Sequence, residues 1–155
     1  MKKSDRISQF VQTICSQSDG SFDARYRGYF QCFNEQQYYE AHDVLEDLWL
    51  ERRDENYAFY KGLIQVAGGF VHLQKQYLHP DHPHHGKRLR PASRLFALAL
   101  QNMEPYGAEH LSLDLEVLRT LCLAQIELLE KSDFQKNPWC PEVAPRIHLK
   151  PEIKG

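Results

Sequence analysis

Two ionisable side chains and two large aromatic ones recur at helical spacing in one stretch of the chain. His42 and Glu46 are four residues apart and Trp49 follows His42 by seven, so in a helix all three would share a face with Tyr38 and Leu45. We expect this face to be buried. An imidazole and a carboxylate in an apolar stripe must be paired, protonated or bound to a metal, because an isolated buried charge is too costly to keep. The stretch therefore predicts a polar site on one helix face.

The next helical stretch offers groups that would complete such a site. Gln65, Gly69 and His72 are spaced four and three apart, which leaves a smooth notch between two polar side chains on one face. Gly68 and Gly69 each lower helix stability by about 1 kcal/mol relative to alanine, so we expect another helix to approach closely there. The notch would then receive the imidazole and carboxylate of the preceding helix.

The chemistry that this pairing suggests is metal binding. His42, Glu46 and His72 supply nitrogen and oxygen ligands suited to zinc, iron or manganese, and a histidine from a facing helix commonly completes a metal site in a helical bundle. Two histidines and one carboxylate would leave positions open for water or substrate, so a divalent metal ion is the cofactor to test and metal-dependent hydrolysis the first reaction. Four residues are expected to contact a small ligand: Tyr38, Glu46, Trp49 and Gln65.

Two other interpretations stay open. In the first, His42 and Glu46 form a hydrogen-bonded pair that fixes helix register against Gln65 and His72 with no ligand, since an exposed pair of this spacing contributes only about 0.3 kcal/mol and is common by chance. In the second, the aromatic surface and the C-terminal tail bind another protein or a second copy of the chain, which would make a homodimer.

A histidine-rich loop and a basic cluster precede the predicted helix at residues 91–103. Residues 79–85 hold four histidines and one aspartate, a composition that can bind metals without folded geometry. Lys87, Arg88, Arg90 and Arg94 follow at the start of the next helix. The favoured interpretation of this cluster is a solvated helix flank, and the alternative is an anion site, because cations at a helix N-terminus gain nothing from the helix dipole.

Helices must position all of these residues, and helical periodicity runs through the chain. The 155 residues predict one all-α domain, a bundle of about five to six helices with an extended C-terminal tail. The predicted helices cover residues 5–17, 26–33, 38–52, 57–77, 91–103 and 115–132. Asp114 is expected to cap the last helix, and Trp139 to hold the tail on the bundle. The expected divisions are an N-terminal helix and linker at 1–22, a bundle core at 23–132 and a proline-rich tail at 133–155.

Composition and sequence motifs argue against several classes of function. Nineteen basic and twenty-one acidic residues give a net charge of −2, so we expect neither nucleic acid nor an anionic membrane as partner. No apolar run approaches the roughly 20 residues that cross a bilayer. Four widely spaced cysteines and an N-terminus without an apolar secretory segment favour the reducing cytoplasm. Phosphate-loop, nucleophile-elbow and zinc-finger signatures are absent from the sequence.

Two runs of sequence resemble a known family. FNEQQYYEAHDVLEDLW at residues 33–49 and YKGLIQVA at residues 60–67, together with His72, look like domain of unknown function 309, a family of small helical proteins. The segment 92–106, which ends in Glu-Pro-Tyr, is similar to a third family segment, so the resemblance covers roughly residues 26–130. It implies an all-helical bundle and no established activity. The chain departs from the family in the histidine-rich insert and in Gln36, where such proteins often have glycine.

Overall fold

The computed structural model describes residues 22–84 and 87–151 and confirms the all-α class. Five α-helices lie within this part of the chain: α2 (Ala24–Asn34), α3 (Tyr38–Glu51), α4 (Tyr57–Leu78), α5 (Leu89–Met103) and α6 (Leu115–Lys131). None of them is long and apolar enough to cross a membrane. The smaller elements are β1 (Glu109–His110), β2 (Leu113–Asp114) and the 3-10 helix η1 (Pro141–Val143). The helix predicted at 5–17 lies outside the described residues.

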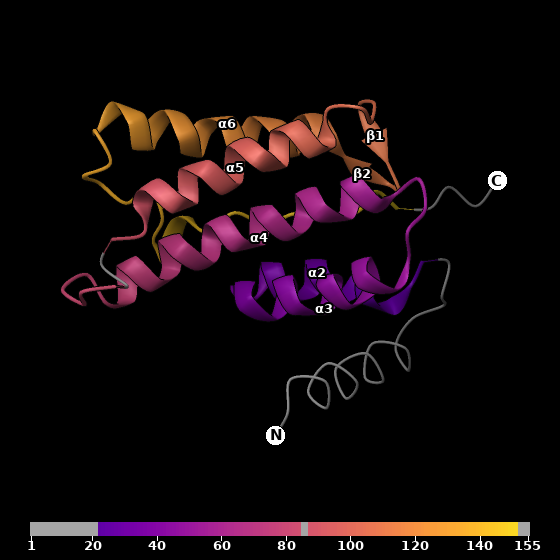
Figure 1. The fold of residues 1–155 in the computed structure, drawn as a ribbon, viewed down its shortest axis with the longest axis horizontal. Coiled ribbons are helices and arrows are strands. Elements are labelled where there is room, and N and C mark those ends of the chain that lie inside the picture. The colour runs from indigo at the N-terminus through magenta and orange to yellow at the C-terminus, as the bar shows by residue number, and fades with distance from the viewer. Residues whose placement is uncertain (1–21, 85–86, 152–155) are drawn as a thin grey trace, which may run out of the picture.

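Helix α4 forms the middle of the bundle. Helices α2 and α3 pack on one side of it, and α5 and α6 lie on the other (Figure 1). Buried aromatic rings connect the layers. The centroid of the Phe70 ring on α4 lies 5.4 Å from the ring centroids of Phe33 on α2 and Tyr38 on α3. It lies 5.1 Å from the ring centroid of Phe96 on α5. Such pairs contribute about 1 kcal/mol each beyond the area that they bury.

Two glycines let α4 and α5 approach closely. A Cβ atom at Gly69 would lie 2.6 Å from the ring of Phe96, and one at Gly62 would lie 2.7 Å from Cγ of Met103. The close approach predicted at the glycine pair is therefore present, but the neighbour is α5. The notch at Gly69 is filled by Phe96, so the expectation that it would receive groups from α3 is wrong.

The connection between α5 and α6 is a short β-hairpin that the periodicity analysis missed. His110 pairs with Leu113, and the two loop residues Leu111 and Ser112 have φ of 46° and 60°, as in a type I′ turn. Tyr26 of α2 donates a 2.9 Å hydrogen bond to the Leu111 carbonyl and so helps to hold this strained turn. Two strands of two residues each are too short for alternation to reveal.

The start of α6 agrees with the predicted cap. The Asp114 carboxylate accepts hydrogen bonds from the backbone N–H groups of Glu116 at 3.0 Å and Val117 at 3.2 Å. These two donors have no partner within the first turn of a helix, so the side chain satisfies them.

The C-terminal tail lies across the bundle. Asn34 holds it by two hydrogen bonds, from its amide to the Ile147 carbonyl at 2.8 Å and from the Ile147 N–H to its side-chain oxygen at 2.7 Å. The indole N–H of Trp139 donates to the Tyr38 hydroxyl at 3.1 Å, and Trp139 is buried. The tail thus covers the aromatic core that α2 and α3 build.

Replacing Gly69 tests the contact between α4 and α5. We expect Gly69→Ala to lower the free energy of unfolding by about 1–3 kcal/mol in urea titrations, because the new methyl group overlaps the buried Phe96 ring. Gly68→Ala is the matched control, since its Cβ would meet only the flexible tip of Leu95 at 3.1 Å. That variant should stay within about 1 kcal/mol of the parent, as alanine also favours the helix. Equal stabilities of the two variants would contradict the packing described.

Candidate functional site

The predicted face of α3 lies at the margin of the core. Tyr38 and Leu45 are fully buried, whereas the side chains of His42 and Glu46 are each 30% exposed and Trp49 is partly buried. The expectation that this face is buried therefore holds for Tyr38 and Leu45 and is wrong for His42 and Glu46. The three residues sit on the side of the helix where the apolar stripe meets solvent, so a charge there keeps part of its hydration.

His42 has two acidic neighbours. Its Nδ1 lies 3.1 Å from the Asp43 carboxylate, and its Nε2 lies 3.7 Å from Glu46. The predicted His42–Glu46 proximity is thus present, although 3.7 Å is too long for a direct hydrogen bond. Asp43 is 4% exposed and received no role from the sequence, because it lies about 100° around the helix from His42 and off the apolar stripe.

Gln65 and His72 of α4 face the α5 side. Gln65 accepts a 2.7 Å hydrogen bond from the side-chain amide of Asn102, and the Nδ1 of His72 lies 3.0 Å from a guanidinium nitrogen of Arg88. Arg88 also donates its backbone N–H to Gln76 at 2.7 Å. A row of polar contacts therefore follows the seam between α4 and α5, and it fixes the register of these two helices.

His72 is held neutral by this arrangement. Burial, followed by the nearby charges of Arg88 and Lys75, lowers the pKa of His72 to about 4. Because Arg88 donates to Nδ1, the proton of the neutral ring lies on Nε2, and neither nitrogen then offers a lone pair to a metal.

The predicted metal set is not assembled. Within residues 22–84 and 87–151, no three His, Cys, Asp or Glu side chains form a group that could hold a metal ion. His42 and Glu46 remain together, but His72 is engaged by a cation on the other side of α4. The described histidines of residues 79–84 belong to no such group either.

The residues expected to contact a small ligand also lie in different surroundings. Tyr38 is fully buried under Trp139, and Gln65 is engaged by Asn102. Trp49 stacks on Tyr57 with ring centroids 5.0 Å apart, and among residues 22–84 and 87–151 its buried indole N–H has no hydrogen-bond partner. The ligand-binding role of Tyr38, Glu46, Trp49 and Gln65 stays a prediction.

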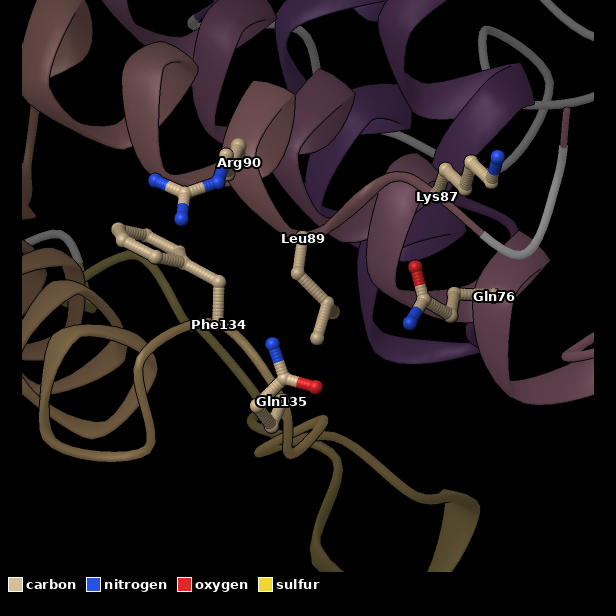
Figure 2. A pocket seen from close by; sticks show the side chains of 6 residues that line it. All are labelled: Gln76, Lys87, Leu89, Arg90, Phe134 and Gln135. Carbon is tan, nitrogen blue, oxygen red and sulfur yellow. The ribbon is translucent and has the colours of Figure 1, made fainter.

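A basic pocket lies at the end of the α4–α5 seam where α4 ends and α5 begins. It has a volume of about 430 Å³, and Figure 2 shows the six side chains around it. They come from the end of α4, the start of α5 and the turn after α6: Gln76, Lys87, Leu89, Arg90, Phe134 and Gln135. The lining side chains within the described part of the chain are basic, amide or apolar. We call this group the basic pocket.

The turn after α6 builds one wall of the basic pocket. Asp133 and Phe134 have φ of 53° and 58°, and the Gln135 N–H donates to the Ser132 carbonyl at 3.1 Å, which makes a second type I′ turn. Aspartate tolerates this left-handed conformation, whereas phenylalanine rarely adopts it. The turn sets the Phe134 ring 4.2 Å from the Arg90 guanidinium carbon, while the Asp133 carboxylate lies 3.8 Å from Arg90.

The structure separates the four cations of the predicted basic cluster. Arg88 turns inward to His72, Lys87 and Arg90 line the basic pocket, and Arg94 is exposed without lining it. The interpretation as a uniformly solvated flank is therefore wrong for Arg88. The sequence suggests an anion site at these cations as an alternative. It does not indicate that Phe134 and Gln135 line the same pocket, because more than forty residues separate them from Lys87.

Part of the chain matches a known protein family. Residues 26–80 match the family described as Domain of unknown function (DUF309). The match confirms the family resemblance over most of α2, all of α3 and all of α4. It ends before residues 92–106, so the resemblance of that segment stays a prediction. No curated protein and no solved structure matches the chain.

The position of His72 predicts a pH dependence of stability. The unfolded ring has its ordinary pKa near 6.5 and the folded ring about 4, so the unfolded state binds the proton first. The stabilisation is complete above pH 6.5 and is lost as the pH falls to 4, by on the order of 1–2 kcal/mol after allowance for partial exposure.

The variant His72→Asn isolates this effect, because the asparagine oxygen can accept from Arg88 but does not titrate. Urea denaturation at several pH values should show a smaller loss of stability between pH 6.5 and 4 in the variant than in the parent. Parallel pH profiles for the two proteins would show that His72 is not held neutral.

Proposed function

We propose that the protein binds a small anionic ligand in the basic pocket. The observation that carries the proposal is the lining of the pocket, where the described polar residues are the cations Lys87 and Arg90 and the amides Gln76 and Gln135. An anion there would meet two cations and neutral hydrogen-bond donors. The charges on the chain as a whole nearly cancel, so this attraction is local.

The size of the pocket supports a small organic ligand. Its volume of about 430 Å³ falls in the range of roughly 300–1,000 Å³ common for ligand sites. Leu89 and Phe134 add an apolar surface beside the two cations. Asp133 lies 3.8 Å from Arg90, but its side chain is 87% exposed, so an incoming anion can displace it at small cost.

A second candidate is a ligand site at the margin of α3, formed by His42, Glu46 and Trp49. The buried indole N–H of Trp49 without an acceptor favours it, because an unsatisfied buried donor costs about 1–3 kcal/mol. A metal ion at His42 and Glu46 would need a third ligand other than His72 to support hydrolysis.

We also propose a cytoplasmic location and keep a homodimer as an alternative role. Cys32, Cys122 and Cys140 are free thiols, which supports a reducing compartment. Val117 and Leu128, three turns apart on α6, are 59% and 50% exposed and would lie in an interface between copies. Sedimentation velocity distinguishes monomer from dimer.

Removing either cation of the basic pocket should weaken anion binding. We expect calorimetric titrations with inorganic phosphate and with benzoate to detect binding of at least one anion, and Arg90→Gln or Lys87→Gln to reduce its affinity about tenfold, or about 1.4 kcal/mol. Added salt should weaken the binding as well.

Arg94→Gln is the matched control, since it removes a charge one turn further along α5 without touching the basic pocket. Its affinity should equal that of the parent. Equal losses in all three variants would refute the proposed function.

A further inference from the structure

We propose that the ligand of the basic pocket is a phosphate monoester, a doubly charged phosphoryl group carried on an apolar body. The inference rests on the proposed function and adds the chemical class of the anion. Three features of the pocket carry it: the number of available cations, the donor geometry of Arg90, and the apolar surface beside them.

The two cations lie three residues apart, and of the two only Arg90 has an acidic partner among the described residues. Lys87 belongs to the loop before α5, and within the described part of the chain its ammonium group makes no ion pair. Arg90 belongs to the first turn of α5, and its ion pair with Asp133 at 3.8 Å is longer than a hydrogen bond. Two positive charges match a phosphate monoester, which carries about −1.5 to −2 at neutral pH, better than a carboxylate with −1.

The guanidinium group of Arg90 is held in an orientation that suits a phosphoryl group. Its carbon lies 4.2 Å from the centroid of the Phe134 ring, which covers one face of the group. The N–H donors on its edge stay available for two oxygens of one phosphoryl group. The Lys87 ammonium group points away from Arg90 in Figure 2, so its flexible side chain has to turn towards the pocket to serve a third oxygen, which a carboxylate does not possess.

The rest of the pocket suits an organic group and not a bare ion. Leu89 is 3% exposed and lines the pocket, and the exposed part of Phe134 faces the same space (Figure 2). The side-chain amides of Gln76 and Gln135 lie around this surface and would contact polar atoms of the ester. An apolar group attached to the phosphate would therefore add affinity that inorganic phosphate lacks.

Calorimetric titrations with three probes test the inference. Phenyl phosphate carries both features, benzoate has the ring with a single charge, and inorganic phosphate has the charge without the ring. We expect phenyl phosphate to bind at least tenfold more tightly than either of the others. Benzoate binding as tightly as phenyl phosphate would overturn the phosphate class, and inorganic phosphate binding as tightly would overturn the ester, while the proposed function would stand in both cases.

The variant Lys87→Gln adds a second readout. Loss of the second cation should weaken phenyl phosphate about tenfold and benzoate less than threefold, so that the preference between them shrinks. Arg94→Gln should leave the preference unchanged, and circular dichroism confirms that each variant is folded. Equal losses for both probes in Lys87→Gln would overturn the inference, and no binding of any probe would refute the proposed function itself.

Discussion

The close approach of α4 and α5 at Gly62 and Gly69 is the contact on which the rest of the structure depends. With no side chain at either position, Met103 and Phe96 of α5 fit against the backbone of α4. Phe96 then completes the aromatic contacts that reach through Phe70 to the α2–α3 layer. A methyl group at Gly69 would disturb this packing, because a dense core has no space into which the ring can retreat.

The close approach of α4 and α5 also determines which residues Gln65 and His72 of α4 contact. Gln65 and His72 lie beside the glycine face, so they meet Asn102 and Arg88 of the α5 side and not the residues of α3. Inward rotation of Arg88 leaves Lys87 and Arg90 at the mouth of the basic pocket, where the turn after α6 brings Phe134 to Arg90. The α4–α5 contact thus keeps His72 with Arg88, and the ligand site that we propose lies where α4 ends and α5 begins.

The sequence predicts the elements better than it predicts their partners. Spacing located α3 and α4 within about one residue of their observed ends, and Asp114 marked the start of α6. The hairpin at Leu111 escaped notice because its strands are too short to alternate. Periodicity shows that Gln65, Gly69 and His72 share a face, but it cannot say which neighbouring helix covers it. Only the structure shows that Phe134 joins Arg90, since their contact depends on a strained turn with an atypical sequence.

The central claim is that the ligand site lies at the start of α5 and not at the polar margin of α3. Chemical-shift mapping with ¹⁵N-labelled protein and phenyl phosphate tests this claim most directly, because both regions are observed in one titration. The account predicts that the shifts centre on the backbone amides of Lys87, Leu89, Phe134 and Gln135. Shifts that centre on His42, Glu46 and Trp49 would contradict it.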